Sequence, residues 1–544
     1  MSVAITPLWV AGPAAAAPSH SGSLTASLWG DLGDDLAALD GSGHNNASAD
    51  PGSLYTIENA IGARSVWRQQ DASGQQITGR GVTIALLDSG TAPVAGLNAP
   101  GKLSYGPDLS IESNGALTDQ DTFGHGTHLA GIIAGHDPAV LNAKTIPKLD
   151  PSVQLGVAPD AQLLSMKLAN TDGSVDVSQV IAALNWITEH QTAQDGSQVR
   201  VVNLSFGTDS LQPYQLDPLA AAAENAWRHG LVVVVSGGNE GNGSGRLTDP
   251  AIDPYVIAVG ASDDGGKVSG WTSPTVASFS SGGSDSRHVD LLAPGTSVVS
   301  LRDPGSYVDV NHPEGLVVGD TTGRLFRGSG TSQAAAVVSG SVALLLQAYP
   351  DLTPDQVKAA LTQSASWVNA SPRYAGAGEL NVSSALTVAK QLATPPCRGL
   401  LCKVIGGLLG SNSNVSQNFP VATGQGSIEA ARGGNDLVDA DGVRLSGEID
   451  VQGNAWNPQA WWASASTLQS WNGGNWLGAI WTGSDWLPGA GGLSSARWSS
   501  ARWSSARWSD ADWDSARWSS ARWSSARWSS ARWSSARWSD AGWD

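Results

Sequence analysis

Residues 328–340 read Gly-Ser-Gly-Thr-Ser-Gln-Ala-Ala-Ala-Val-Val-Ser-Gly, and a mostly apolar run continues from them to Leu346. A glycine turn followed by small and apolar residues predicts a buried helix that begins beside Ser332. A helix N-terminus has unpaired backbone N–H groups and favours negative charge, so an oxyanion forming next to Ser332 would be stabilised. On this stretch alone, the commoner interpretation is that Ser332 or Thr331 simply caps the helix.

The composition argues against two classes of protein, those that mainly bind nucleic acid and those that span a membrane. The chain has 544 residues and a formal net charge of −18, and only 14% of its residues are charged. Nucleic acid is not expected as the main partner, because its phosphate backbone is itself negative. No apolar run approaches the ~20 residues that a membrane-spanning helix needs, so no transmembrane segment is expected. The two cysteines, Cys397 and Cys402, could form a local disulfide in an oxidising compartment, which the sequence alone does not establish.

The N-terminal residues favour export. Residues 1–18 combine an apolar stretch with an alanine-rich end typical of a signal cleavage site, although no basic segment comes before them. The alternative is a disordered terminus rich in alanine and proline. Residues 19–54 predict a flexible extension or part of a pro-segment. We therefore expect a secreted, extracellular protein, and association with the cell surface stays open.

From Leu54 onward, short apolar runs alternate with helical patterns. The runs expected to form buried strands are 81–87, 162–168, 199–205, 231–235 and 255–259, and the helical patterns between them include 177–190 and 218–229. Strands that alternate with helices predict an α/β fold with a mostly parallel sheet between layers of helices. In such sheets, catalysis takes place beyond the carboxyl ends of the strands.

Polar residues follow several of these expected elements. Asp88 comes directly after the first apolar run, where a buried carboxylate needs a partner. His125 lies between two glycines at the start of a small-residue helix, and Asn239 follows a strand where its amide could donate to an oxyanion. For Asp88 and Asn239 the structural alternative is an ordinary turn. A metal site at His125 and His128 is weakly indicated, because no acidic third ligand has a persuasive spacing.

Together these residues match a known pattern. The order Asp88, His125, Asn239, Ser332, in the motifs ALLDSG, GHGTHLAG, VVVVSGGNEG and GSGTSQAAAVVSG, closely resembles the subtilisin-like (S8 family) serine peptidases over about residues 55–392. The resemblance implies the three-layer subtilisin-like fold and a serine endopeptidase with the triad Asp88, His125 and Ser332. It also implies an oxyanion hole formed by Ser332 and Asn239. The chemistry would need no cofactor, and structural calcium is implied by the resemblance only.

The resemblance also indicates how a substrate binds. An extended protein or peptide would be added as a strand, which favours flexible or unfolded substrates. The residues assigned to this role are Ser205, Phe206, Gly207, Gly237 and Gly238. One departure follows the nucleophile, where the family usually shows Met-Ala-Ala-Pro-His and this chain has Gln-Ala-Ala-Ala-Val at 333–337. That change affects the expected packing of the helix more than the expected proton transfer.

The C-terminal part is dominated by tryptophan. From Trp456 tryptophans recur at intervals of five, and ten more lie between Trp498 and Trp543 in units of Ser-Ser-Ala-Arg-Trp. Residues spaced by five share neither one face of a helix nor one face of a strand. We favour a low-complexity, mostly disordered tail over a pentapeptide-repeat solenoid, although 511–515 fits the template of such repeats. Interleaved arginine and tryptophan suit binding to a cell surface or polymer, and suit single-stranded nucleic acid less well.

These observations predict a division of the chain and a leading function. The expected segments are a signal remnant at 1–18, an extension at 19–54, the peptidase domain at 55–392, a linker at 393–450 and a repeat tail at 451–544. The competing hypothesis is a surface-binding protein whose peptidase-like domain is inactive. An intact set of Asp88, His125, Asn239 and Ser332 favours the active enzyme.

Overall fold

The computed structural model describes residues 50–481 except for 114, 141–145, 147–152, 194–195, 264–273, 395–414, 434–436 and 440–443. For residues 437–439, 444–445, 496–498 and 502–503 it describes the backbone alone. The segment 1–18, nearly all of 19–54, Cys397 and Cys402, and most of the five-residue repeats lie outside the described residues.

The centre of the molecule is a sheet of eight described strands in the order β2-β3-β1-β4-β6-β7-β8, with β9 also paired to β7. All of its pairs are parallel except β7–β8. The strands are β1 Thr83–Asp88, β2 Leu103–Tyr105, β3 Gln162–Lys167, β4 Val199–Leu204, β6 Val232–Ser236, β7 Ile257–Asp263, β8 Thr275–Val276 and β9 Leu291–Pro294. Each of the five predicted apolar runs contributes a strand, which confirms the predicted α/β fold with a mostly parallel sheet.

Two pairs of helices pack on this sheet. α4 (His125–Ala134) packs against α8 (Thr331–Ala348), and α5 (Val177–Glu189) packs against α6 (Pro218–Arg228). Almost every residue of α8 is buried, including the unusual segment 333–337, because small side chains let the helix lie close to the strands. Among the described helices, α8 alone is long and apolar enough to cross a membrane, but 94% of it is buried in the protein.

The ends of these elements follow ordinary capping rules. α5 begins with a capping box at Asp176, and α9 (Pro354–Gln363) begins with another at Thr353, as its sequence predicts. The remaining elements before residue 394 are α2 Leu54–Ala60, α3 Ala63–Val66, β5 Phe206–Gly207, β10 Val298–Leu301, α7 Tyr307–Asn311, the 3₁₀ helix η2 Pro313–Gly315, β11 Leu325–Gly328, α10 Pro372–Ala375 and α11 Val382–Ala393.

The far end of α8 is joined to the residues that precede β1. The side-chain Oε1 of Gln347 accepts hydrogen bonds from the backbone N–H groups of Thr78, Gly79 and Arg80, at 2.8, 2.7 and 3.0 Å. β1 begins a few residues later, at Thr83. Three backbone donors are thereby satisfied by one buried amide.

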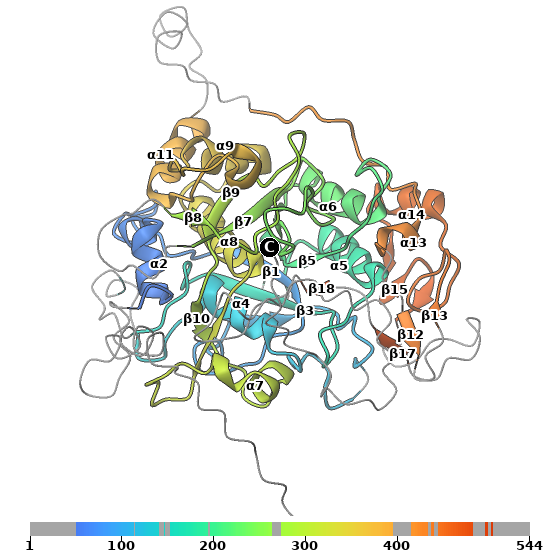
Figure 1. Cartoon of the computed structure of the whole chain (residues 1–544), viewed down its shortest axis with the longest axis horizontal. Coiled ribbons are helices and arrows are strands. Elements are labelled where there is room, and N and C mark those ends of the chain that lie inside the picture. The colour runs from blue at the N-terminus through green and yellow to red at the C-terminus, as the bar shows by residue number, and fades with distance from the viewer. Residues whose placement is uncertain are drawn as a thin grey trace, which may run out of the picture.

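Residues 415–481, which we call the C-terminal extension, pack beside α5 and α6 (Figure 1). The elements of this part of the chain and of the strands beyond it are α13 Ile428–Ala431, β12 Leu437–Asp439, β13 Arg444–Leu445, α14 Pro458–Ala465, β14 Trp471–Asn472, β15 Asn475–Trp476, β16 Ala479–Ile480, β17 Ala496–Trp498 and β18 Arg502–Trp503. β12 pairs with β13 and β17, and β14, β15 and β16 form a small antiparallel sheet.

Four tryptophans anchor the extension. Trp461 donates from Nε1 to Oδ1 of Asn185 on α5 at 3.0 Å, and Trp471 donates from Nε1 to a backbone carbonyl of the same helix at 2.9 Å. Trp456 and Trp476 are also buried, and all four belong to the hydrophobic core that includes the central sheet. Tryptophan suits this position because it buries a large ring, and the N–H groups of Trp461, Trp471 and Trp476 also find polar partners.

A buried ion pair joins the extension to the residue that precedes α5. Arg432 donates from Nε to Oδ2 of Asp176 at 2.8 Å, and both side chains are almost completely buried. The packing of 415–481 differs from the expected linker and mostly disordered tail. The physical reason is that these tryptophans lie in different elements, separated by turns, so their five-residue interval does not make them equivalent.

Candidate active site

Asp88 and His125 are brought together from two elements. Asp88 ends β1, the strand between β3 and β4, and His125 is the first residue of α4. Nδ1 of His125 lies 2.8 Å from Oδ1 of Asp88, and both side chains are fully buried. Gly126 permits this approach, because a Cβ there would collide with the carbonyl oxygen of Gly90.

A second carboxylate holds the Asp88–His125 pair in place. Asp121 accepts hydrogen bonds from Ser89 Oγ and Gly124 N at 2.7 Å, and from the N–H and hydroxyl of Thr127 at 2.7 and 2.6 Å. It therefore ties the turn after β1 to the first turn of α4. The sequence interpretation missed Asp121, although a carboxylate just ahead of a helix start is a recognisable capping signal.

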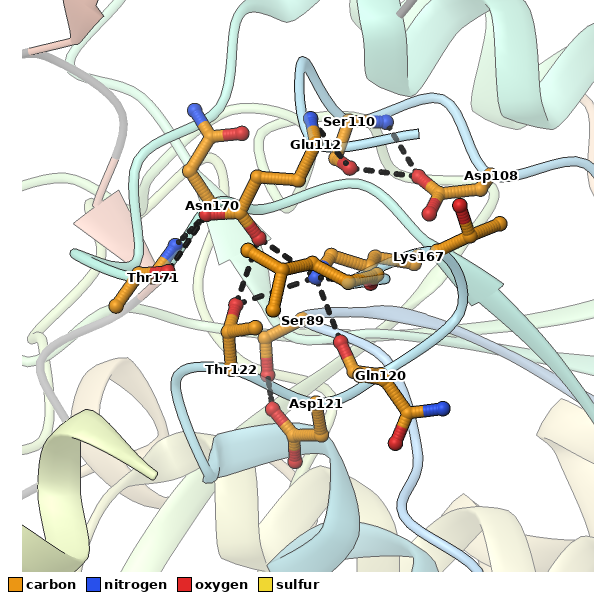
Figure 2. A network of polar contacts seen from close by, with 12 residues as sticks. Ser89, Asp108, Ser110, Glu112, Gln120, Asp121, Thr122, Lys167, Asn170 and Thr171 are labelled. Carbon is orange, nitrogen blue, oxygen red and sulfur yellow. Dashed lines mark hydrogen bonds and ion pairs between the residues drawn. The ribbon is translucent and has the colours of Figure 1, made fainter. Parts of the chain in front are cut away.

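The loop that leads to α4 is held by a buried lysine (Figure 2). Lys167 ends β3 in register with Asp88, and its Nζ donates to Glu112 at 2.7 Å and to the carbonyl oxygen of Gln120 at 2.6 Å. Burial alone would raise the pKa of Glu112, but its contacts with Lys167 and Thr171 lower it. The anionic Glu112 thus satisfies a lysine that would otherwise be buried unpaired.

The environment of Asp88 favours a positive neighbour. Burial raises the pKa of its carboxyl group, while His125 and the Ser89 N–H act in the opposite direction. A buried carboxylate is disfavoured without compensation, so the contact with the His125 ring stabilises the charge of Asp88. A carboxylate held in this way can fix the orientation of an imidazole for proton transfer.

Ser332 and Asn239 meet at the N-terminus of α8. Ser332 is the second residue of α8 and is buried. Oδ1 of Asn239, in the loop after β6, accepts hydrogen bonds from the N–H and hydroxyl of Thr331, both at 2.9 Å. The oxygen of this amide therefore faces the helix. The donor group of the same amide, Nδ2, is at its other end. α4 packs against α8, so His125 and Ser332 begin two neighbouring helices.

The residues expected to bind substrate flank the same helix start. Ser205 Oγ donates to the backbone oxygen of Ser332 at 3.5 Å, and Phe206 and Gly207 form β5 directly after it. On the other side, the Gly238 N–H donates to the Thr331 hydroxyl at 3.3 Å. The fifth expected residue, Gly237, uses its N–H within the sheet, in a 2.8 Å hydrogen bond to the Val259 carbonyl.

The second histidine of the GHGTHLAG motif belongs to α4 and is buried in the protein. Burial lowers the pKa of His128 to about 3, with a further contribution from His125, so the ring is neutral near pH 7. Within the part of the chain that the structure describes, no three His, Cys, Asp or Glu side chains are grouped to hold a metal ion. Calcium is also held by backbone and amide carbonyl oxygens, so the structural calcium that the resemblance implies stays a prediction.

Comparison with known proteins agrees with this arrangement. The sequence model of the subtilase family matches residues 79–383, more than half of the chain. The chain belongs to the subtilase family. As a subtilase it is a serine-type endopeptidase, and the matched residues span the central sheet and the helices that carry the site.

Individual relatives of this subtilase include bacterial peptidases. The serine protease AprX of Bacillus subtilis (strain 168) is 34% identical over 61% of this chain and 71% of its own length. Subtilisin DY of Bacillus licheniformis is 31% identical over 57% of this chain and 93% of its own length. Subtilisin Savinase of Lederbergia lenta is 31% identical over 58% of this chain and 94% of its own length.

Proposed function

We propose that this subtilase hydrolyses peptide bonds with Asp88, His125 and Ser332 as its catalytic triad. The observation that carries the proposal is the buried 2.8 Å contact between Asp88 and His125 at the first turn of α4, which packs against α8, the helix whose second residue is Ser332. Asp88 would hold Nδ1 of the imidazole, so Nε2 is the atom assigned to proton transfer.

The reaction would proceed through an acyl-enzyme. Ser332 Oγ attacks the scissile carbonyl while His125 accepts its proton, and His125 then gives that proton to the leaving amine. A water molecule then attacks the acyl carbonyl while His125 accepts its proton. His125 returns that proton to Ser332 Oγ, and the acyl group is released as a carboxylic acid. Nδ2 of Asn239 and the backbone N–H of Ser332 would bind the oxyanion, aided by the N-terminus of α8.

The substrate would be an extended, flexible segment of protein or peptide. Its main chain would pair with β5 at the start of α8 and pass beside the Gly237–Gly238 segment, whose own N–H groups donate to the Val259 carbonyl and the Thr331 hydroxyl. Such pairing uses backbone groups and therefore requires an unfolded stretch more than a particular sequence.

Labelling with a serine-directed fluorophosphonate tests this proposal. We expect the reagent to modify Ser332, and Ser332→Ala to abolish hydrolysis of an unfolded protein substrate while the circular dichroism spectrum stays unchanged. Ser341→Ala provides a matched control, because Ser341 lies on the same helix and its hydroxyl only donates to the carbonyl oxygen of Val337. Labelling of another residue, or undiminished hydrolysis by Ser332→Ala, would contradict the triad.

Two further parts of the proposal concern where the protein acts. The apolar, alanine-rich residues 1–18 support secretion, and N-terminal sequencing of protein recovered from the culture medium tests it. Retention on a cell surface or polymer through the Trp/Arg tail is the basis of the alternative, an inactive surface-binding protein. The assembled Asp88–His125 pair favours the enzyme, and the same fluorophosphonate experiment separates the two.

A further inference from the structure

The repeat tail pairs with the strand that is proposed to bind substrate. β18 (Arg502–Trp503) is antiparallel to β5, with Arg502 opposite Gly207 and Trp503 opposite Phe206. The two strand labels stand together beside β1 in Figure 1. An edge strand offers its unpaired N–H and C=O groups to any extended chain, so β18 and a substrate would use the same groups of β5.

The pairing lies close to the nucleophile and is directed toward it. Ser205, the residue before β5, contacts the backbone oxygen of Ser332 at 3.5 Å. In the antiparallel register, one step along the tail from Arg502 to Trp503 is one step along β5 from Gly207 to Phe206, which is toward Ser205. The tail strand therefore approaches the start of α8 from within the proposed substrate position.

The extension brings the tail to this position through a short connection. The Thr208 hydroxyl, directly after β5, donates to the carbonyl oxygen of Ala431 at 2.6 Å. β17 (Ala496–Trp498) pairs with β12 of the same region, and only three residues separate β17 from β18. The four Cα–Cα steps from Trp498 to Arg502 span at most roughly 14 Å, so β18 is held close to β17 and the extension. A short tether corresponds to an effective concentration on the order of millimolar.

The charge and the repetition of the tail suit this role. Residues 494–544 contain eight arginines and five aspartates, so they are basic within a chain of net charge −18. Opposite net charges favour association of the tail with the remainder of the protein. The Arg-Trp pair occurs eight times in this tail, and main-chain pairing is tolerant of sequence. Neighbouring repeats could therefore replace 502–503 at β5.

We propose that the Ser-Ser-Ala-Arg-Trp repeats are a tethered peptide that occupies the substrate strand β5 and keeps the full chain weakly active until the tail is detached. The inference rests on the proposed function of β5 as the strand that binds substrate. The tail competes with substrate without altering the catalytic groups, so its removal lowers KM and leaves kcat unchanged.

The test is to detach the tail from the folded full chain. A recognition sequence for a highly specific cysteine protease is inserted between residues 482 and 495, and the cut tail is removed by gel filtration in moderate salt. We expect KM for a short chromogenic peptide to fall about tenfold or more after cutting, at constant kcat, because an intramolecular competitor has been removed. The matched control carries the same insertion without its scissile residue and should not change.

Adding the tail back in trans completes the experiment. A synthetic peptide of three Ser-Ser-Ala-Arg-Trp units should raise the KM of the cut enzyme, whereas a version N-methylated at each arginine and tryptophan should not, because it lacks the N–H groups of the two residues that face β5. An unchanged KM after cutting, together with no competition by the peptide, overturns the inference.

A binding measurement separates this inference from the proposed function. In the Ser332→Ala background, the fluorescently labelled repeat peptide should bind the cut chain, and the N-methylated version should not. Such binding by a chain whose active-serine parent hydrolyses nothing would support the tail inference and contradict the peptidase. Full hydrolysis without peptide binding would support the peptidase and contradict the tail inference.

Discussion

At the scale of single residues, the two ends of the Asn239 amide differ in what they do, because one supports a helix and the other is proposed to bind the oxyanion. Oδ1 accepts from the N–H and hydroxyl of Thr331, which positions the loop after β6 against the first turn of α8. Nδ2 is the end assigned to the oxyanion. A residue that both supports the helix and donates to the intermediate needs a control that separates the two effects.

We predict that Asn239→Ala lowers kcat by about 10²–10³, as loss of one oxyanion donor does in subtilisins, with little change in KM. Thr331→Ala removes one of the two hydrogen bonds to Oδ1 but keeps the proposed donor, so its kcat should fall far less. Steady-state kinetics of both variants on one peptide substrate provides the measurement. Equal losses in the two variants would mean that Asn239 acts mainly by supporting α8.

At the scale of elements, α4 combines a proposed catalytic residue at its start with a buried interior that disfavours charge. His125 at its first position pairs with Asp88, whereas His128, one turn later, is buried with its pKa lowered to about 3. In the unfolded chain a histidine has a pKa of about 6.5. Between these values the unfolded chain binds a proton at His128 that the folded chain does not, so acid favours unfolding.

We therefore predict that His128 contributes a loss of stability of ~1.4 kcal/mol per pH unit as the pH falls from about 6.5 toward 3, and no further loss below that. His128→Gln should remove this contribution, so its free energy of unfolding relative to the parent should rise as the pH falls. Denaturant unfolding at several pH values, in the Ser332→Ala background to prevent self-digestion, measures the difference. Parallel pH curves for the two proteins would contradict it.

The elements that could be predicted from sequence are those whose signal is local. The apolar runs that became β1, β3, β4, β6 and β7 are each continuous in sequence, and the glycines near Asp88 and His125 mark close backbone approaches that only glycine permits. Asp121 escaped notice because its function depends on Ser89, 32 residues away in sequence. Nothing in the residues around Asp121 indicates that distant partner.

The docking of residues 415–481 could not be predicted for a similar reason. Trp461 and Arg432 find their partners Asn185 and Asp176 on α5, more than 250 residues earlier in the chain. The spacing of the tryptophans in the extension resembles that of the later repeats, which led to the expectation of a disordered tail. The interval between tryptophans alone does not show which of them pack into the hydrophobic core.

At the scale of the whole molecule, the folded unit continues past the peptidase motifs. The extension shares one hydrophobic core with the sheet, and each buried tryptophan removes roughly 150–250 Å² from water, worth several kcal/mol. Removing one partner of a buried ion pair such as Arg432–Asp176 typically costs about 3–5 kcal/mol as well. Such sums are large against a total stability of about 5–15 kcal/mol.

We predict that a chain ending at residue 393 loses most of its soluble, folded protein, because α5 and α6 would expose the surface that Trp461 and Trp471 cover. A chain ending at 481 keeps the extension and should melt within a few degrees of the full chain. Calorimetry of both truncations in the Ser332→Ala background measures this. A stable, cooperative transition for the 393 truncation would show that the extension is dispensable for folding.

The hydrogen bonds of Gln347 have a consequence for the active site at the opposite end of the same helix. Fifteen residues of α8 place Gln347 roughly 22 Å from Ser332. Gln347 binds the N–H groups of Thr78 to Arg80, and β1 runs from that point back to Asp88. Helix, amide and strand thus make three sides of a rigid frame, and the Asp88–His125 contact with the packing of α4 on α8 makes the fourth. A tilt of the helix at its distant corner would change the spacing between the proposed nucleophile Ser332 and the proposed base His125, so their alignment would depend on a glutamine at the opposite end of α8.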